Sequence, residues 1–183
     1  RRPVEEVSSE TDLVASEANL YVGTEAVLHR VDKADVVVFL DFDQELLAPR
    51  YRAAEQAMSL LVQAARMVGR REDGGRILIQ TRMPQHPVLE AARTADPGSL
   101  ARTELVMRRE LQQPPEAHWA IVSGPSAAEF IRRLGIQPGL EILGPSNDRW
   151  RIRGDNREQM VAMLKSVDRP PGRLRIEINP LRA

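Results

Sequence analysis

The chain has 183 residues, a formal net charge of zero and no cysteine, and this length suits one large domain or two small ones. The lack of cysteine excludes disulfides and thiolate metal sites and permits a cytoplasmic location. No apolar run is long enough for a signal peptide or a transmembrane helix, so no membrane contact is expected.

Charge is unevenly distributed along the chain. Residues 1–83 carry 11 Lys and Arg against 14 Asp and Glu, whereas residues 84–183 carry 15 against 12. A basic C-terminal part favours a polyanionic partner. The first residue is an arginine rather than methionine, which is typical of a piece taken from a longer protein.

The N-terminal part is expected to begin with irregular structure. Residues 1–17 are polar and acidic, with one helical turn expected around Val4–Val7, and Asn19–Val22 predicts a short strand. The strand leads into Gly23 and Thr24. A Gly-Thr turn after a strand can bring the backbone close to a ligand phosphate, although most such turns only redirect the chain.

A β-loop-α-β unit follows. The continuous apolar run Val36–Leu40 predicts a strand buried on both faces, as in parallel sheets. An amphipathic helix is expected to begin near Tyr51 and to end at Gly69, which would serve as its C-terminal cap. A second strand is expected at Arg76–Thr81, which makes this part an α/β sheet. The apolar face predicted for the helix consists of Ala54, Met58, Leu61, Val62, Ala65 and Val68.

Two acids, Asp41 and Asp43, follow the first of these strands. Paired acids at strand ends hold Mg²⁺ in several α/β enzymes, and they also cap loops. Because no third ligand or nucleophile is close in sequence, loop capping is the preferred interpretation and no metal site is predicted. The three histidines are scattered without metal-ligand spacing.

Two short motifs in this unit resemble a known family. They are Leu40-Asp41-Phe42-Asp43 and Arg52-Ala53-Ala54-Glu55. In the family of primosomal replication-restart helicases (PriA, or primosomal protein N′), a strand ending Leu-Asp-x-Asp leads into an Arg-Ala-Ala-Glu helix. The resemblance implies that residues 1–83 form part of a RecA-like helicase lobe two.

The motifs that couple nucleic acid to nucleotide in this family are altered here. The family has Gly-Thr-Gln-Met followed by Lys-Gly. In this chain Gly23 and Thr24 are retained, while Glu25, His29 and Arg30 replace Gln, Lys and Gly. An acid facing a phosphate would repel it, so the motif is expected to be impaired.

The family's Gln-x-x-Gly-Arg-x-Gly-Arg motif places two arginines toward the γ-phosphate of ATP. Here Gln63, Gly69 and Arg70 match, but Arg66-Met67 stands in place of the first Gly-Arg pair. Arg70 is therefore the only catalytic arginine that the resemblance implies, as a finger that stabilises charge in phosphoryl transfer. The alternative is that the arginines here are solvated cations at a helix end.

Residues 84–115 are predicted to form a helical linker. Helices are expected at Val88–Ala95 and from Asp96 or Ser99, one of which serves as the cap, to about Leu111. Its residues Pro84–Pro87 and Arg108–Pro115 resemble the same family, which has Pro-x-His-Pro and then Arg-Arg-x-Leu-x-x-Pro-Pro at this place. Such a linker would orient two domains.

Residues 116–183 predict a small α+β domain with the order β-α-β-β-α-β. Ser126 and Asn156 are expected to cap its two helices, with Glu129 completing a capping box at the first. The family's C-terminal domain resembles ribosomal protein S10 and has this element order. Strands are expected at Ala117–Ser123, Leu140–Leu143, Arg149–Arg153 and Arg173–Ile178, and helices at Ser126–Leu134 and Asn156–Val167. The family's signatures appear as Leu143-Gly144-Pro145, Arg149-Trp150 and Asn179-Pro180, the last with Asn in place of Asp.

Arginines alternate with apolar residues on two of these strands. In this fold both helices cover one face, so the apolar set, with Trp150, should line the core and the arginines should gather on the other face. That face could follow a nucleic-acid backbone, or it could be a solvated surface. The candidate DNA-binding residues are Arg149, Arg151, Arg153, Arg173 and Arg175.

The resemblance spans most of the chain, from Gly23 to Pro180. It implies a protein that binds forked or single-stranded DNA, couples ATP and Mg²⁺ to 3′–5′ unwinding, reloads the replicative helicase and meets single-strand-binding protein and other primosome proteins. The family's zinc ligands and Walker lysine are absent from this chain, so it is not expected to be an active ATPase alone. The alternatives are a restart protein that has lost its ATPase and an unrelated α/β nucleic-acid-binding protein.

Overall fold

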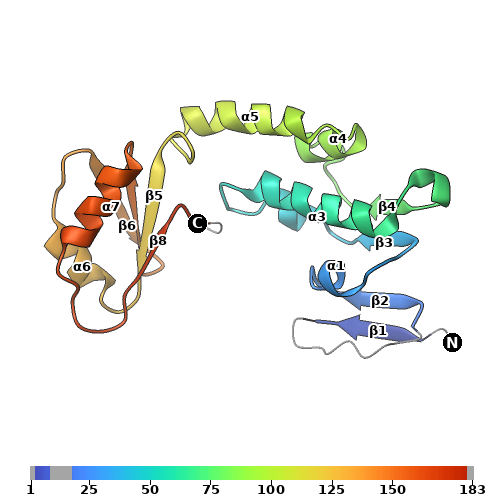
Figure 1. Ribbon diagram of the computed structural model, residues 1–183, viewed down its shortest axis with the longest axis horizontal. Coiled ribbons are helices and arrows are strands. Elements are labelled where there is room, and N and C mark those ends of the chain that lie inside the picture. Colours follow the sequence, from blue (N-terminus) through green and yellow to red (C-terminus); the bar gives the residue numbers. More distant parts are fainter. Residues whose placement is uncertain (1–2, 9–17, 181–183) are drawn as a thin grey trace. The chain divides into compact units, whose positions relative to one another are not determined.

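A computed structural model describes residues 3–8 and 18–180 of the chain (Figure 1). The chain divides into two compact units. The N-terminal unit comprises Arg1–Pro49 and Ala53–Leu100, and the C-terminal unit comprises Arg50–Arg52 and Ala101–Ala183. Within the described ranges, no helix has both the length and the apolar character needed to cross a membrane.

The N-terminal unit begins with two short parallel strands, β1 (Val4–Val7) and β2 (Leu20–Gly23). The helical turn expected at Val4–Val7 is therefore wrong. Each residue of this segment pairs with one of β2, starting with Val4 opposite Leu20. Tertiary pairing overrides the weak local preference of a four-residue segment.

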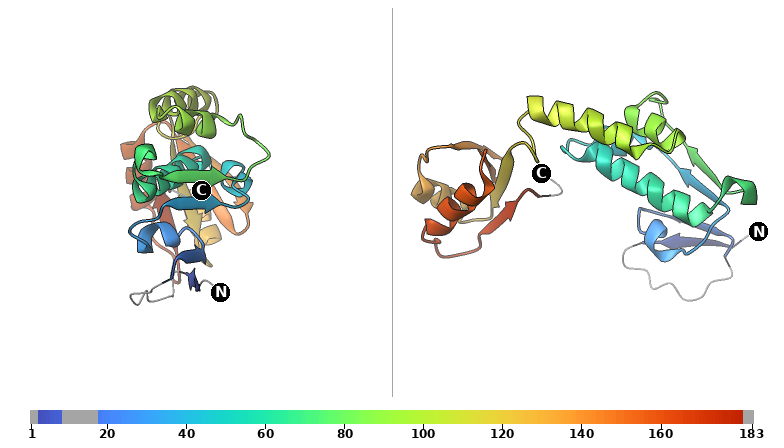
Figure 2. Two further views of the ribbon diagram at one scale, coloured as in Figure 1. Left: turned by 90° about the vertical axis from the view of Figure 1, so that its right-hand side faces the viewer. Right: turned by 45° about the horizontal axis from the view of Figure 1, so that its top comes forward.

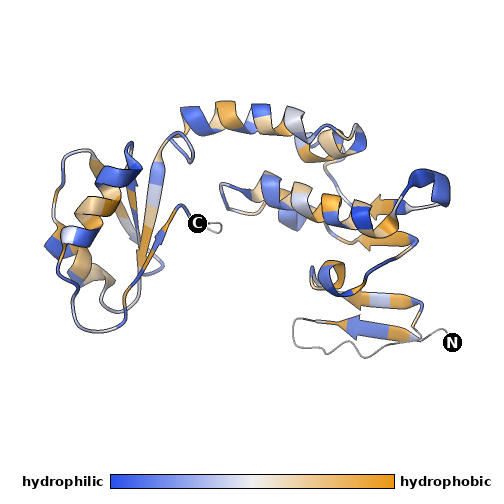
Figure 3. Ribbon diagram, viewed as in Figure 1, coloured by the Kyte–Doolittle hydropathy of each residue, from blue (hydrophilic) through white to orange (hydrophobic). Residues whose placement is uncertain are grey.

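The predicted β-α-β unit is confirmed. Strands β3 (Val36–Phe39) and β4 (Arg76–Ile79) are parallel neighbours, and helix α3 (Ala53–Val68) connects them. The prediction that β3 is buried on both faces is wrong. Figure 3 shows both strands as hydrophobic, yet Val38 and its partner Leu78 are each more than half exposed. Helix α3 packs on the face that carries Phe39 and Ile79, whereas Val36, Val38 and Leu78 on the other face are each about half exposed.

The predicted buried face of α3 is confirmed in part. Met58, Leu61 and Val68 are buried as predicted. Val62 and Ala65 are exposed, and the helix buries residues such as Ala57 and Ala64 instead. The helix is apolar around more than half of its circumference, so periodicity alone does not select the buried stripe. Gly69 ends the helix with a positive φ of 73°, as predicted. The core of the unit consists of Phe42, Leu46, Ala57, Met58, Leu61, Val88, Leu89, Ala91 and Leu100.

Short helical segments complete the N-terminal unit. They are α1 (Val27–Arg30), α2 (Asp43–Leu46) and the 3₁₀ turn η1 (Arg71–Asp73), none of which the sequence pattern predicts. Segments of three or four residues carry too few apolar positions to show a period.

Two longer helices, α4 (Pro87–Arg93) and α5 (Pro97–Glu110), occupy the predicted linker. The His86 side chain accepts a hydrogen bond from the amide of Val88 at the start of α4. At α5 the cap is Asp96, whose carboxylate accepts from the amide of Ser99 at 3.1 Å. Proline stands at the first position of both helices, where its missing N–H costs no hydrogen bond.

The C-terminal unit has the predicted β-α-β-β-α-β order. Its strands form one antiparallel sheet in the order β6-β7-β5-β8. Helices α6 and α7 lie on the same side of this sheet (Figure 2) and share one core with it. The strands are β5 (His118–Ser123), β6 (Leu140–Ser146), β7 (Arg149–Gly154) and β8 (Arg175–Ile178), and the helices are α6 (Ala127–Leu134) and α7 (Arg157–Ser166).

The middle strands are joined by a tight hairpin. Strand β6 continues to Ser146, three residues beyond its predicted end, and only Asn147 and Asp148 separate it from β7. Both have positive φ, of 50° and 56°. A two-residue loop with this conformation matches the twist of the strands, and Asn and Asp tolerate it well.

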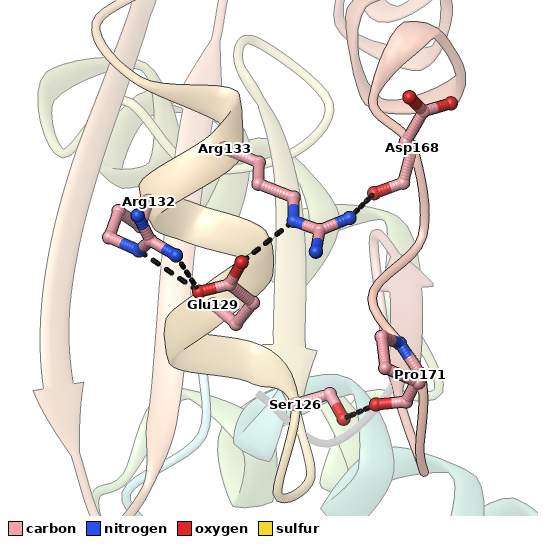
Figure 4. A network of polar contacts seen from close by, with 6 residues as sticks. All are labelled: Ser126, Glu129, Arg132, Arg133, Asp168 and Pro171. Carbon is pink, nitrogen blue, oxygen red and sulfur yellow. Dashed lines mark hydrogen bonds and ion pairs between the residues drawn. The ribbon is translucent and has the colours of Figure 1, made fainter.

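The capping box expected at α6 is absent. The Ser126 hydroxyl donates instead to the carbonyl of Pro171, and Glu129 is paired with Arg132 and Arg133 (Figure 4). These two arginines hold the pKa of Glu129 below its usual value, mainly through hydrogen bonds. At α7 the predicted cap is confirmed, because Asn156 accepts from the amide of Gln159 at 2.9 Å.

Candidate nucleic-acid interface and helicase-motif residues

The side of the C-terminal sheet opposite α6 and α7 carries four of the five candidate arginines, and we call it the arginine face. Strand alternation places Ala120, Val122 and Ile152 in the core shared with the helices. Their neighbours along β5, β7 and β8 therefore point the other way. Trp150 packs against the core, as predicted. The arginine face consists of Trp119, Ile121, Ser123, Glu141, Leu143, Arg149, Arg151, Arg153, Arg175 and Glu177.

Two of the five candidate arginines contact a side chain on a neighbouring strand. Arg153 forms an ion pair with Glu141, its direct partner on β6. The guanidinium carbon of Arg151 lies 4.4 Å from the centroid of the Trp119 ring, a cation–π contact. Its Nε atom is buried and has no hydrogen-bond partner. Both side chains are already committed to neighbours on the arginine face.

The other three arginines are exposed. Arg175 pairs with Glu177 two residues along β8, at 2.9 Å, and both side chains reach solvent. Arg149 and Arg173 make no ion pair or side-chain hydrogen bond with any residue that the structure describes. Arg173 lies two residues before β8 rather than inside it, so its predicted place in the strand is wrong. Its backbone carbonyl instead accepts from the amide of Ser126 at 3.3 Å.

Trp119 is the centre of a stack that the sequence does not reveal. It is only 6 % exposed, and the Tyr51 ring lies 5.2 Å from it at 56°. Its ring N–H donates to the carbonyl of Gln112 at 3.1 Å. Together with Arg151 on the sheet, Tyr51 covers the indole ring, so Trp119 is not free to stack on a nucleic-acid base. Tyr51 belongs to the C-terminal unit despite its early position in the sequence.

Arg108 holds Tyr51 in place. This arginine is 5 % exposed and lies 3.5 Å from the carboxylate of Glu104. Its guanidinium donates to the carbonyl oxygens of Tyr51 at 3.2 Å and Pro114 at 3.3 Å. The first arginine of the predicted Arg-Arg-x-Leu-x-x-Pro-Pro signature is therefore a structural centre of the C-terminal unit. The second, Arg109, is exposed and pairs with Glu116.

Gly23 has a packing role that accounts for its presence. A Cβ atom at this position would lie 1.9 Å from the carbonyl oxygen of Val7 on β1. The close backbone approach made possible by glycine is thus used for strand pairing. Thr24 follows and begins the turn into α1, its carbonyl accepting from Val27 at 3.0 Å. In the described part of the chain, no hydrogen bond or ion pair joins these residues to Gln63, Gly69 or Arg70.

The end of α3 carries the second altered motif. Met67 is 5 % exposed, so the position where the family has its first arginine is part of the packed interior. Gln63 is half-buried, and its side-chain oxygen has no hydrogen-bond partner. Gly69 and Arg70 lie beyond the helix and are exposed. Of the two motif positions that carry arginine in the family, only Arg70 presents a guanidinium to solvent.

Asp43 anchors the loop after β4. Its carboxylate accepts hydrogen bonds from the Thr81 hydroxyl and from the amide of Arg82, the latter at 3.0 Å. These hydrogen bonds lower the pKa of Asp43. Asp41 has a positive φ of 52° and accepts from the Gln44 side chain at 2.7 Å. Both acids have the contacts of loop-capping residues, and no cluster of three metal-ligating side chains occurs in residues 3–8 and 18–180.

The lowered pKa of Asp43 predicts a pH-dependent stability of the N-terminal unit. A carboxyl group whose pKa is lowered by folding stabilises the fold above its unfolded pKa, and this contribution is lost as pH falls through the folded value. We expect Asp43→Asn to be less stable than the parent at pH 7, with the difference shrinking below about pH 4. Hydrogen exchange of β4 at pH 7 and at low pH measures this. A difference that stays constant with pH would contradict the prediction.

Comparison with known proteins identifies relatives of this chain. It is 29% identical over 175 residues to the replication restart protein PriA of Bacillus subtilis, covering 82% of this chain and 22% of that protein. It is 26% identical over 169 residues to PriA of Thermotoga maritima, covering 86% and 22%. With PriA of Synechocystis it shares 35% identity over 101 residues, which cover 54% of this chain and 12% of the relative.

No family model matches the chain. The chain spans about a fifth of the length of its Bacillus and Thermotoga relatives. Both of these similarities cover more than four fifths of the chain, and they therefore extend through both of its units. The chain is PriA-like: it is related to the replication restart proteins PriA over most of its length.

Proposed function

We propose that this chain contributes DNA binding to a replication restart protein and that the arginine face is the DNA interface. The supporting observation is that the three arginines of β7 and Arg175 of β8 lie on one side of the sheet, away from both helices. The names of the relatives point to replication restart, a process that acts on DNA. The comparatively basic C-terminal part provides an electrostatic reason for the location.

Such an interface would contact phosphates rather than read bases. The guanidinium group of arginine can donate two parallel hydrogen bonds to the oxygen atoms of a phosphate. Contacts of this kind position a protein on nucleic acid without selecting a sequence. The one tryptophan on the arginine face is already covered by Tyr51 and Arg151. The proposed binding is therefore electrostatic, without base stacking on Trp119.

Salt dependence tests this proposal. We expect the chain to bind labelled forked DNA in fluorescence anisotropy, with the logarithm of the affinity falling linearly with the logarithm of salt concentration. Each phosphate contact on duplex DNA contributes about 0.9 to the slope. Binding that is absent at low salt, or that does not respond to salt, would overturn the proposal.

A wider role follows from the family resemblance. We propose that the N-terminal unit corresponds to part of a RecA-like helicase lobe two and the C-terminal unit to an S10-like domain. In the longer protein they would serve ATP-coupled unwinding and the reloading of the replicative helicase, together with single-strand-binding protein and other primosome proteins. The cysteine zinc ligands that the resemblance implies are not among the residues of this chain.

A second candidate is a restart protein whose ATPase has been lost. Two observations support it. Met67 is buried at the position where the family has an arginine. At Gly23, the backbone that approaches closely is that of Val7 rather than a ligand phosphate. DNA-stimulated ATP hydrolysis by the longer protein, with and without Arg70→Ala, separates the candidates. Turnover that collapses in the variant supports Arg70 as a finger, because loss of such a group costs about 10³-fold or more. Tight fork binding without turnover supports the second candidate.

A further inference from the structure

The arginine face has two dissimilar ends. We propose that Arg149, Ser123 and Arg175 form a phosphate-binding row at one end of it, a proposal that rests on the DNA-binding function given above. Ser123 is the last residue of β5 and is paired with Arg149 on β7 and with Arg175 on β8. The three side chains therefore share one register position across neighbouring strands and point to the same side of the sheet.

The spacing of the row suits phosphate groups. Cα atoms of directly paired residues in antiparallel strands lie about 5 Å apart, so Arg149 and Arg175 are separated by roughly 10 Å with the Ser123 hydroxyl between them. Two long arginine side chains at this separation can converge on one phosphate or hold two adjacent ones. Ser146, the partner of Arg149 on β6, extends the row by a second hydroxyl. Every member can donate a hydrogen bond to a phosphate oxygen.

The guanidinium groups of Arg149 and Arg175 are accessible to a phosphate. Arg149 is exposed, and its guanidinium has no ion pair with the residues described. Among the described residues, Arg175 has Glu177 as its ionic partner, and an ion pair whose members both reach solvent contributes little to stability. Exchange of this carboxylate for a phosphate is therefore inexpensive.

The opposite end of the arginine face is more enclosed. The Arg153 side chain is 35% exposed, against 71% for Arg175, and it is paired with Glu141 on the neighbouring strand. Arg151 lies on the Trp119 ring with its Nε buried. A phosphate would therefore reach these two guanidinium groups less readily than those of Arg149 and Arg175. DNA backbone contacts should therefore concentrate at the Ser123 end, although arginines extend along the whole of β7.

Neutral substitutions at the two ends test whether the phosphate contacts are confined to the row or spread over the whole arginine face. Arg149→Gln, Arg175→Gln and Arg153→Gln each remove one positive charge from the same face of the full 183-residue chain. We expect each of the first two to weaken binding of labelled forked DNA by about tenfold and to lower the salt slope by about one. Arg153→Gln should change the affinity by no more than about twofold, and Ser123→Ala should weaken it less than either arginine variant of the row.

Three results would separate this inference from the proposed function. An equal loss in Arg153→Gln and Arg149→Gln overturns the row but leaves the arginine face as the interface. Salt-dependent binding by the parent that none of the four variants weakens overturns both the row and the face. Absence of binding by the parent itself refutes the DNA-binding function. Tryptophan fluorescence during thermal unfolding checks that each variant is folded, since both tryptophans lie in the C-terminal unit.

Discussion

Replacing Arg108 with alanine is expected to lower the free energy of unfolding of the C-terminal unit by about 3–5 kcal/mol, the usual cost of removing one partner of a buried ion pair. The variant leaves the Glu104 carboxylate, which is only 13% exposed, without this guanidinium. It also removes the donors to the carbonyl oxygens of Tyr51 and Pro114. The 5.4 Å contact between the guanidinium and the Tyr51 ring is lost as well.

Urea unfolding followed by tryptophan fluorescence measures this loss. Both tryptophans, Trp119 and Trp150, belong to the C-terminal unit, so the signal reports that unit alone. Arg109→Ala is the matched control, because Arg109 is the next residue of α5 but is exposed, and its solvated pair with Glu116 should contribute little to stability. Equal losses in the two variants would show that Arg108 does not stabilise the unit through these buried contacts.

Trp119→Ala is expected to cost about 3–5 kcal/mol in the same unit, the range for removal of a large aromatic side chain from a core. The indole is 6 % exposed and contacts both Tyr51 and Arg151. Trp119→Phe should recover much of the loss, because it retains an aromatic ring. The recovery should be incomplete, because the ring N–H that donates to the carbonyl of Gln112 is missing. The fluorescence of Trp150 reports unfolding in both variants. A loss below about 1 kcal/mol for Trp119→Ala would contradict the central role of this stack.

Sequence patterns predicted the C-terminal unit better than the N-terminal one. In an antiparallel sheet covered on one side, alternation maps directly onto burial. This is why the side on which Arg149, Arg151 and Arg153 lie could be predicted. A parallel sheet gives no such guide, because its strands are commonly covered on both faces. The apolar run at Val36–Leu40 was therefore expected to be buried on both faces, although one face of β3 is exposed.

The pairing of the candidate residues could not be predicted. Whether Arg151 meets Trp119 depends on the register between β5 and β7, which are distant in sequence. Whether Arg153 meets Glu141 depends on the register shift in the β6–β7 hairpin, between Leu143 and Ser146. Tyr51 is separated by 68 positions from Trp119, and its aromatic contact has no local signal. The capping box at Ser126 failed for a similar reason, because Pro171 offers the hydroxyl a tertiary acceptor. Local rules identify candidate residues, whereas tertiary partners decide which of them remain available.

DNA affinity of two charge-reversed variants is the most direct test of the proposed interface. Arg149→Glu combined with Arg175→Glu reverses two charges on the arginine face, and Arg157→Glu combined with Arg169→Glu reverses two exposed charges on and just after α7. The net charge changes equally in both. We expect the first variant to bind forked DNA at least about 100-fold more weakly than the parent, and the second to bind within a few-fold of it. Equal weakening of the two would mean that the arginine face is not the DNA interface.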